Sequence, residues 1–341
     1  MRRPPLLAVD AGGSKVDAVL LRADGEIVGA ARVRSSDHDG TGSADHLEIV
    51  VEAVRAACID AGVDPERLPV AGLGVYCLAG ADLAADDRRI GRWMRKKGLT
   101  REDVIRNDTF AVLRAGTDRP WGVGVVCGYG TNCSAVAPDG RIFRFPAVGS
   151  ISGDWGGGGD VGGSGLWYAI RAEDGRGERT VLRQLVPAHF GLRRPRQVLE
   201  AMHFGRLDDE LVVELAPVVF AAAKDGDAVA RSIVDRQADE VVAMAGTAMK
   251  RLRMSDLDVD VVLGGGIFRN DDERFFERIR GGLEAVAPRS RIRVLAAPPV
   301  LGAALLGLDR RGAPAAAHRR ARAGLTHERL TAHTLRRRKE T

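Results

Sequence analysis

The strongest constraint on the fold is a pattern of strands and turns that occurs twice, about 118 positions apart. In each copy an apolar strand ends in a glycine-rich turn, a second strand follows, an Asp-Gly turn reverses the chain, and a third strand leads into helices. The glycine-rich turns are Asp10–Lys15 and Gly128–Asn132, and the Asp-Gly turns are Asp24–Gly25 and Asp139–Gly140. Short apolar runs bounded by such turns predict strands, and apolar positions spaced by three and four predict helices. The duplication predicts an α/β protein of two similar βββαβαβα domains that face one another across a cleft.

The length of 341 residues is enough for two such domains, and charge is distributed unevenly along the chain. We place the first domain at residues 1–117, the second, with a helical insertion, at 118–309, and a tail at 310–341. Of the 51 basic and 46 acidic residues the tail holds ten and two, which leaves 41 and 44 for the body. A basic tail poor in large apolar residues is expected to be flexible or loosely helical. Because the body is mildly acidic, nucleic-acid binding is not predicted.

Cysteine and hydropathy patterns predict a cytoplasmic protein with no membrane attachment. The four cysteines, at positions 58, 77, 127 and 133, lie in apolar or glycine-rich stretches and form no CxxC pair, so we expect reduced, buried thiols. The amino-terminal apolar run ends at Asp10 and is too short for a signal sequence, and no later segment is long enough for a membrane-spanning helix. No pair of the seven histidines has a metal-ligand spacing, so no transition-metal site is predicted.

The first glycine-rich turn has the residues of a phosphate-binding hairpin. Gly12 and Gly13 let backbone N–H groups approach phosphate oxygens without a Cβ in the way. Ser14 and Lys15 would add donors, and Asp10 would hold Mg²⁺ directly or through a water molecule. A strand follows the turn, so it is not a Walker A loop, which requires a helix. Taken alone, this turn is equally compatible with an ordinary β-hairpin.

Two further glycine turns follow predicted strands at positions consistent with the repeat. The second turn would hold a triphosphate from the other side of the cleft, and the third would pass close to adenine and ribose. Their residues are Gly128, Gly130 and Thr131 in the second turn and Gly264, Gly265 and Gly266 in the third. Three such turns at repeat-consistent positions indicate a nucleotide site more strongly than any one of them alone.

Together with Asn107 and Asp108, the three turns resemble the motif set of the BadF/BadG/BcrA/BcrD ATPase family, within which N-acetylglucosamine kinases are the closest likeness. The resemblance covers about residues 6–308. It implies the acetate kinase/Hsp70/actin superfamily fold, with two ribonuclease H-like domains of the actin/hexokinase ATPase type and with ATP and Mg²⁺ between them. It also implies a homodimer that acts as an ATP-dependent kinase on the 6-hydroxyl of an amino sugar, N-acetylglucosamine or glucosamine.

The resemblance also assigns roles to single residues. Asp108 matches the general base of the family, which takes the proton from the sugar hydroxyl, and Asn107 stands beside it as support. A carboxylate suits that role chemically, because a sugar hydroxyl is a poor nucleophile until its proton is accepted. The same residue type and position also suit a cap for the helix that follows. Asn132 matches an amide that contacts the sugar, and Ser36 and His38 lie where the family has a sugar-contacting loop.

A glycine-rich run at residues 152–165 resembles two further segments of the family. Gly153 and Asp154 belong to the first resemblance and Gly159-Asp160 to the second, but Val161 stands where the family has Glu. Either Asp154 or Asp160 is therefore expected to be the acid that binds the sugar. The run is too rich in glycine for an independent strand or helix, so we expect a mobile substrate loop or a flexible linker.

Two alternatives to a kinase remain open at this point. The first is the other branch of the same family, ATPase activators of 2-hydroxyacyl-CoA dehydratases or benzoyl-CoA reductases, which carry a [4Fe–4S] cluster shared between two subunits. No pair of cysteines in this chain is placed to hold such a cluster at a dimer face. The second is a sugar or nucleotide sensor without turnover, which the altered segment around Val161 suggests.

Overall fold

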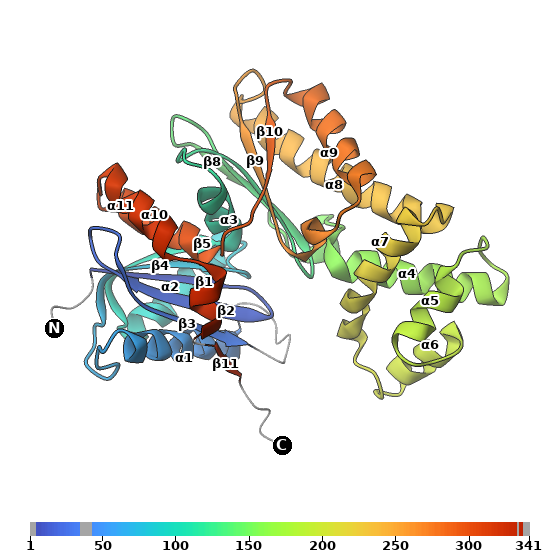
Figure 1. The fold of residues 1–341 in the computed structure, drawn as a ribbon, viewed down its shortest axis with the longest axis horizontal. Helices are drawn as coiled ribbons and strands as arrows, with labels where there is room; N and C mark the ends of the chain where they lie inside the picture. The colour runs from blue at the N-terminus through green and yellow to red at the C-terminus, as the bar shows by residue number, and fades with distance from the viewer. Residues whose placement is uncertain (1–4, 35–42, 333, 337–341) are drawn as a thin grey trace.

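A computed structural model of the chain describes residues 5–34, 43–332 and 334–336 (Figure 1). It contains two mixed β-sheets, with six strands in the order β11-β3-β2-β1-β4-β5 and five strands in the order β10-β9-β6-β7-β8. In each sheet the first strand of a copy pairs antiparallel with the second strand and parallel with the fourth. The predicted duplication of a βββαβαβα unit is confirmed by this shared order.

Both faces of the first sheet are buried, because residues that alternate along its strands meet helices on either side. Leu7 and Val9 face a core shared with α1 and α2, whereas Leu6 and Ala8 face a core shared with α10 and α11. Near-continuous apolar strands are typical of sheets covered on both faces. The elements are β1 Leu6–Ala11, β2 Lys15–Leu21, β3 Ile27–Arg34, α1 Ala44–Asp60, β4 Ala71–Leu78, α2 Ala84–Lys97, β5 Thr100–Asn107, α3 Asp108–Gly116, α10 Val300–Arg310, α11 Ala315–Gly324, α12 His327–Ala332 and β11 Thr334–Arg336.

The second sheet is covered by α8 and α9 on one face and by α3 on the other. Val261 and Leu263 of β9 face the core that contains α8 and α9, whereas Val262 between them meets Val112 and Leu113 of α3. The elements are β6 Gly122–Cys127, β7 Thr131–Val136, β8 Ile142–Arg144, α8 Ala228–Leu252, β9 Asp260–Gly264, η3 Gly266–Arg269, α9 Glu273–Val286 and β10 Arg291–Val294. Helix α8 turns one apolar stripe, spaced by steps of four and three, into this core, and all its members are buried: Val234, Ala238, Val241, Ala245, Ala248 and Leu252.

The last helix of each copy packs on the sheet of the other copy. Helix α3 ends the first copy and packs Val112 and Leu113 on the second sheet, while α10 ends the second copy and packs on the first sheet. The opposite side of α3, with Ala111 and Ala115, shares the core of α10, so the two helices lie between the sheets. Leu301 and Leu305 of α10 share a core with Leu6 and Val75 of the first sheet. The predicted boundary at residue 309 therefore differs from the structure, in which α10 belongs with the first sheet. A boundary drawn along the sequence assumes contiguous domains, and this exchange of helices violates that assumption.

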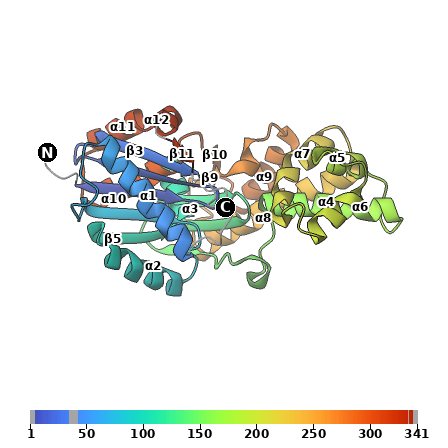
Figure 2. The same ribbon diagram turned by 90° about the horizontal axis from the view of Figure 1, so that it is seen from below.

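A helical insertion separates β8 from β9 and extends from the second half on the side away from the first sheet (Figure 2). It contains η1 Gly149–Ser152, α4 Gly157–Asp174, α5 Leu182–His189, α6 Pro195–His203, η2 Asp209–Leu215 and α7 Ala216–Lys224 before α8 begins. No helix in the described part of the chain is both long enough and apolar enough to cross a bilayer.

The expectation that the glycine-rich run is a loop or linker is wrong, because residues 157–165 form the first half of α4. Glycine at these positions allows close packing. A Cβ at Gly162 would lie 1.8 Å from the carbonyl oxygen of Val212 in η2, and a Cβ at Gly165 would lie 2.6 Å from a methyl group of Val219 in α7. The low helix propensity of glycine is thus offset by close contact with neighbouring elements.

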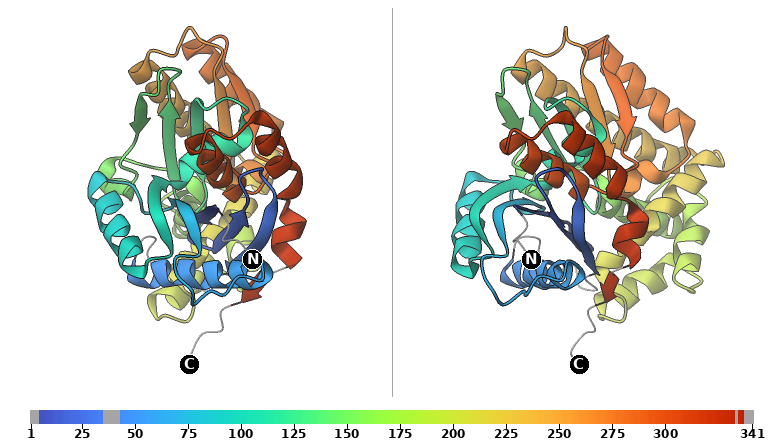
Figure 3. Two further views of the ribbon diagram at one scale, coloured as in Figure 1. Left: turned by 90° about the vertical axis from the view of Figure 1, so that its left-hand side faces the viewer. Right: turned by 60° about the vertical axis from the view of Figure 1, so that its left-hand side comes forward.

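The basic tail is also better ordered than the sequence predicts. Its described residues form α11 and α12, which lie against the first sheet, and β11, which pairs in parallel with β3 (Figure 3). Its small apolar residues Ala317 and Ala321, together with Leu325 and Leu330, are buried in the core shared with α10. Arg319 and Arg320 are exposed on α11, where Arg320 pairs with Asp24. The tail is therefore both strongly charged and packed through a buried apolar face, which the small number of large apolar residues in its sequence does not indicate.

Replacing Leu330 by Ala is expected to lower the free energy of unfolding by about 2–4 kcal/mol, because the Leu330 side chain is 0 % exposed. Urea denaturation monitored by circular dichroism would measure the change. Glu328→Ala on the exposed side of α12 serves as the control and should change stability by less than about 0.5 kcal/mol. Equal stabilities for the two variants would mean that the tail is as loose as its composition suggests.

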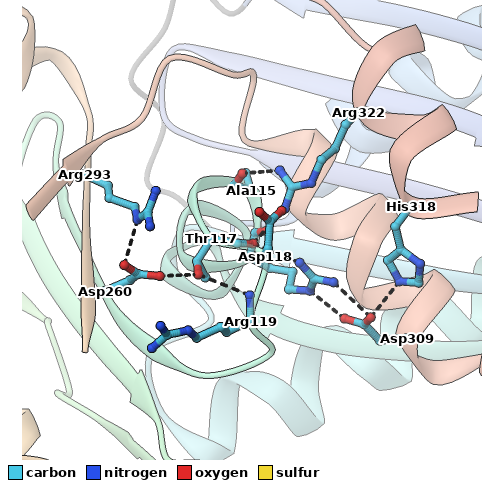
Figure 4. Close-up of polar contacts among 10 residues, drawn as sticks. Ala115, Thr117, Asp118, Arg119, Asp260, Arg293, Asp309, His318 and Arg322 are labelled. Atoms are coloured by element: carbon cyan, nitrogen blue, oxygen red, sulfur yellow. Dashed lines mark hydrogen bonds and ion pairs between the residues drawn. The ribbon is translucent and has the colours of Figure 1, made fainter. Parts of the chain in front are cut away.

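A polar network holds the connection between the two halves (Figure 4). Arg322 of α11 donates to the carbonyl oxygens of Ala115 and Thr117, each at 2.7 Å, at the end of α3. The hydroxyl of Thr117 donates to Asp260 of the second sheet at 2.6 Å. From the other side, Arg114 pairs with Asp309 at the end of α10 through two hydrogen bonds of 2.7 and 3.1 Å. The tail therefore contributes to fixing the segment through which the first half continues into the second.

Candidate active site

Three acidic residues follow the ends of neighbouring parallel strands in the first sheet. Asp10 lies near the end of β1, Asp82 follows β4, and Asp108 follows β5 directly. Because β1, β4 and β5 run in parallel, their carboxyl ends meet at one edge of the sheet. The charges of Asp10 and Asp82 both raise the pKa of Asp108, so the three carboxylates are electrostatically coupled. The sheet topology thus brings Asp10 and Asp108, both predicted from sequence, to one place.

The first glycine turn is closed by a hydrogen bond from the Gly12 N–H to the carbonyl oxygen of Lys15 at 3.0 Å. The Lys15 ammonium lies 3.5 Å from Asp10 and 2.7 Å from Asp17. Asp17 is buried and is also held by Arg32 through two hydrogen bonds of 2.6 and 2.8 Å. This chain of charges holds Lys15 next to Asp10. Burial raises the pKa of Asp10, which is 5 % exposed, to about 6 against the opposing effect of Lys15.

Asp108 is the first residue of α3 and is not its cap. The N-cap is Asn107, whose side-chain oxygen accepts from the N–H of Thr109 at 3.0 Å. Burial is the largest cause that raises the pKa of Asp108 to about 7, followed by the charges of Asp10 and Asp82, against the opposing effect of hydrogen bonds from backbone N–H groups. The capping role that the sequence left open for Asp108 therefore belongs to its neighbour. A carboxylate with a pKa near neutrality is suited to accept a proton at physiological pH.

Asp82 is the site residue that sequence reasoning missed. Its Oδ1 accepts from Nδ2 of Asn107 at 2.9 Å and from Nδ2 of Asn132 at 3.1 Å. Asn107 ends β5 in the first half and Asn132 lies in β7 of the second half, so one carboxylate joins both halves. Asn107 and Asn132 were both predicted as site residues, and Asp82 brings them together. Its position just past the carboxyl end of a parallel strand is the sequence signal that was available.

The second and third glycine turns also meet at one edge, because β6 and β9 are parallel neighbours. In the second turn, the Gly128 N–H donates to the carbonyl oxygen of Gly130 at 3.0 Å. In the third, Gly265 has φ = 108°, and a Cβ there would lie 2.2 Å from the carbonyl oxygen of Cys127. Gly264 is buried against α3, while Gly265 and Gly266 are exposed. The hydroxyl of Thr131, predicted to help the second turn, instead lies 3.3 Å from the sulfur of Cys127.

The start of α4 is bound to the second turn. The N–H groups of Gly158 and Gly159 donate to the carbonyl oxygens of Gly128 and Tyr129 at 2.7 and 2.8 Å. Gly157 donates to the side-chain oxygen of the buried Gln237 of α8 at 2.7 Å. The first N–H groups of α4 are therefore taken up in holding the helix against the turn predicted to bind phosphate.

The two acids predicted as alternatives for sugar binding lie in different surroundings. Asp154, which accepts a hydrogen bond from Ser152, is among the charges that raise the pKa of Asp82, after burial and Asp86. Asp160 is exposed and accepts from the N–H of Gly156 at 2.8 Å at the start of α4. Asp154 is therefore the acid whose charge acts on Asp82, the carboxylate that accepts from both Asn107 and Asn132. Gly153 adjoins it with φ = 83° and is exposed, while Ser36 and His38 lie outside the described residues.

Among the described residues, no group of three or more His, Cys, Asp or Glu side chains converges to hold a metal ion. The donor set near Asp10 nevertheless fits Mg²⁺, which takes oxygen ligands and usually keeps several waters and phosphate oxygens. Burial is the main cause of the raised pKa values of Asp10 and Asp108, and a divalent cation would favour the ionised form of both carboxylates. Asp10 fits such an ion as a single protein ligand or through water, as the sequence predicts.

Comparison with known proteins identifies the same fold. A solved structure from Chromobacterium violaceum, provisionally assigned as an N-acetylglucosamine kinase, superposes with a TM-score of 0.68 at 22 % identity and covers 89 % of this chain and 98 % of its own. The hexokinase of Schistosoma mansoni in complex with glucose gives a TM-score of 0.55 at 15 % identity, with 90 % and 86 % covered. The predicted hexokinase-type fold is confirmed by these likenesses.

Sequence comparison agrees with the structural one. An N-acetylmuramic acid/N-acetylglucosamine kinase of Clostridium acetobutylicum is 23 % identical over 301 residues, which are 88 % of this chain and 97 % of that protein. The profile of the BadF/BadG/BcrA/BcrD ATPase family matches residues 7–307. With the fold, the three glycine turns and the paired acids in place, the chain belongs to the BadF/BadG/BcrA/BcrD ATPase family.

Proposed function

We propose that this protein is an ATP-dependent sugar kinase that transfers a phosphoryl group to the 6-hydroxyl of an amino sugar, N-acetylglucosamine foremost. The observation that carries the proposal is the carboxylate of Asp108 at the carboxyl-terminal edge of the first sheet, whose pKa burial and the charges of Asp10 and Asp82 raise to about 7. ATPase activity alone does not require a base for an alcohol, whereas transfer to a hydroxyl benefits from one. The printed activity of the Clostridium acetobutylicum relative supports the amino-sugar class.

ATP supplies the phosphoryl group, and the residues of the chain position it and accept the proton. The backbone N–H groups of the glycine turns and the ammonium of Lys15 bind phosphate oxygens from the two halves. Asp10 would hold Mg²⁺, which would neutralise phosphate charge when bound. Asp108 accepts the proton of the sugar hydroxyl as the new oxygen–phosphorus bond forms and the bond between the γ-phosphorus and the bridging oxygen breaks, so that ADP leaves. Most of the rate enhancement in such reactions comes from positioning and charge stabilisation, and the base adds to it.

Sugar recognition is proposed for Asn132 and Asp154. Asp154 is coupled to Asp82, and Asn132 shares the Asp82 carboxylate with Asn107. Asp160, the alternative acid, is exposed and already accepts a hydrogen bond at the start of α4. We therefore favour Asp154 over Asp160 as the acid that binds the sugar.

The cysteines weigh against the activator branch of the family. All four side chains, Cys58, Cys77, Cys127 and Cys133, are free and 0 % exposed. A cluster shared between two subunits needs thiolates at a surface, and burial raises the pKa of the Cys127 thiol to about 12. A brown purified protein with absorbance near 400 nm would restore the activator branch.

A coupled assay of ADP release across a panel of sugars tests the proposal. N-acetylglucosamine and glucosamine should stimulate ADP release in the presence of Mg²⁺, and the product should be the 6-phosphate by NMR. N-acetylglucosamine methylated at its 6-hydroxyl is the matched control, since it retains the rest of the sugar but has no acceptor. Measurable ATP binding with no sugar-stimulated turnover would favour a sensor instead.

A further inference from the structure

Asp82 lies where the two halves meet, in the loop between β4 and α2. Both of its hydrogen bonds to side-chain amides of the described residues go to Oδ1, one from Asn107 in the first half and one from Asn132 in the second. Asn132 also donates to Oδ1 of Asn107 at 3.3 Å. The three side chains form a closed polar cluster in which the amides fix the orientation of the carboxylate.

The amide oxygens of this cluster are already occupied. Oδ1 of Asn107 accepts from the N–H and hydroxyl of Thr109 at 3.0 and 2.6 Å. Oδ1 of Asn132 accepts from the N–H of Cys133 at 2.7 Å. No residue that the structure describes donates a hydrogen bond to the second carboxylate oxygen of Asp82, Oδ2, so this oxygen keeps its full accepting capacity for a ligand. A fixed acceptor at this position suits a hydroxyl donor.

We propose that Asp82 is a specificity-determining residue of the proposed kinase, whose Oδ2 accepts a hydrogen bond from a ring hydroxyl of a neutral sugar. The inference rests on the proposed function, and it narrows the substrate class to neutral, polyhydroxylated sugars. It assigns Asn107 and Asn132 the role of positioning Asp82, in addition to any contact of their own with the sugar.

The charge around Asp82 favours neutral over anionic sugars. Asp86 and Asp154 both act on it as neighbouring negative charges, and Asp82 acts in turn on Asp108. Arg144 is the cation that acts on Asp82, but its guanidinium already pairs with Asp87 at 2.7 and 3.3 Å. A sugar that carries a carboxylate, such as N-acetylmuramic acid, would meet net negative charge here. Repulsion of the wrong ligand is a common source of specificity.

Two substitutions distinguish the proposed hydrogen bond of Asp82 to the sugar from its structural hydrogen bonds to Asn107 and Asn132. In Asp82→Asn, the amide oxygen still accepts from Asn107 and Asn132, but an NH₂ group replaces Oδ2 and accepts nothing from a hydroxyl. In Asp82→Ala, both amides lose their acceptor, so stability falls as well. Asp86→Asn is the matched control, because it removes one negative charge nearby and keeps the side-chain oxygen that accepts from Leu83.

The test measures kcat and KM for N-acetylglucosamine, N-acetylmuramic acid and ATP with each variant, together with the melting temperature. Asp82→Asn should raise KM for N-acetylglucosamine about 10- to 100-fold, the loss of a hydrogen bond to a charged group, and leave KM for ATP unchanged. Its melting temperature at neutral pH should be no lower than that of the wild type, because burial raises the pKa of Asp82 and the ionised carboxylate opposes folding. The preference for N-acetylglucosamine over N-acetylmuramic acid should shrink at least tenfold. Asp86→Asn removes one of the neighbouring charges but no proposed contact with the sugar, so KM for N-acetylglucosamine should stay within about threefold of wild type, and the preference over N-acetylmuramic acid should shrink by less than about threefold.

The proposal is overturned if Asp82→Asn has the wild-type KM for the neutral sugar while Asp82→Ala melts early, since Asp82 would then act only as a brace. An equal effect of Asp86→Asn would also overturn it, because general charge would explain the result. If the wild-type protein phosphorylates no sugar, the proposed function fails separately. Calorimetry with N-acetylglucosamine then tests the role of Asp82. Weaker binding by Asp82→Asn than by the wild type supports the inference. Equal binding by the two proteins, or no binding by the wild type, refutes it.

Discussion

Asp108→Asn is expected to lower kcat for the sugar by about 10²- to 10⁴-fold while ATP binding stays within about twofold of wild type. The substitution keeps the size of the side chain at the start of α3 and removes the group that accepts the proton. Stopped assays of sugar phosphate formation and a fluorescent ATP analogue would measure the two effects. Asp139→Asn, the same chemical change in an exposed turn, should leave kcat unchanged. A wild-type rate in Asp108→Asn would remove Asp108 from the mechanism.

The pH dependence provides a second readout of the same substitution. Since the pKa of Asp108 is raised to about 7, wild-type kcat/KM should fall about tenfold per unit as pH drops below 7 and the carboxylate becomes protonated. In Asp108→Asn this limb should be lost, and the weaker decline that remains should lie near pH 6, where Asp10 and Asp82 titrate. An unchanged limb near pH 7 would assign it to another group.

Stability should move in the opposite direction to activity. A carboxylate whose folded-state pKa is above its ordinary value of 3.8 favours folding only when protonated, so its contribution is full at low pH and is lost as pH rises through 7. At pH 8 the ionised Asp108 therefore destabilises the fold, and Asp108→Asn should be more stable than wild type by about 1–4 kcal/mol. This advantage should shrink as pH falls from 7 toward 5, which thermal melts across that range would show.

Two adjacent glycines in α4 are expected to respond to the same substitution with opposite signs. Gly162→Ala places a Cβ 1.8 Å from the carbonyl oxygen of Val212, so α4 and η2 must separate, at about 3 kcal/mol. Gly163→Ala places its Cβ where nothing lies within 4 Å, and it should stabilise the helix by about 0.5–1 kcal/mol. Urea denaturation of the pair would measure the difference of about 4 kcal/mol, with each variant controlling for the change in propensity of the other.

The pair also tests the link between α4 and the second glycine turn. Because the N–H groups of Gly158 and Gly159 bind the turn carbonyls, displacement of α4 in Gly162→Ala should weaken ATP binding as well as stability. Gly163→Ala should bind ATP as the wild type does. Equal stability of the two variants would mean that residues 157–165 are flexible, as their composition suggests. It would contradict the close packing of α4 on η2.

Much of the site was predictable because its signals are local. The glycine turns and the strands before them are encoded in a few adjacent residues, and their recurrence predicts the sheet order. Parallel strands bring residues at their carboxyl ends to one edge, as they do Asp10 and Asp108, although the role of Asp108 was indicated by the resemblance to the family. The same rule could have indicated Asp82, but no sequence motif contains it. Its role depends on Asn107 and Asn132, which lie 25 and 50 residues away in the sequence.

The remaining features depended on contacts between distant segments. By itself the sequence determined the two α/β repeats, the glycine turns and the acids at their strand ends, because backbone freedom and hydropathy period act over a few residues. The tertiary structure alone decided that a glycine-rich run is a helix, that α3 and α10 exchange sheets, that the basic tail packs on a core and that Asp82 joins the halves. Each depends on which surfaces a segment meets, and burial against a distant neighbour outweighs the weak local propensities that a sequence displays.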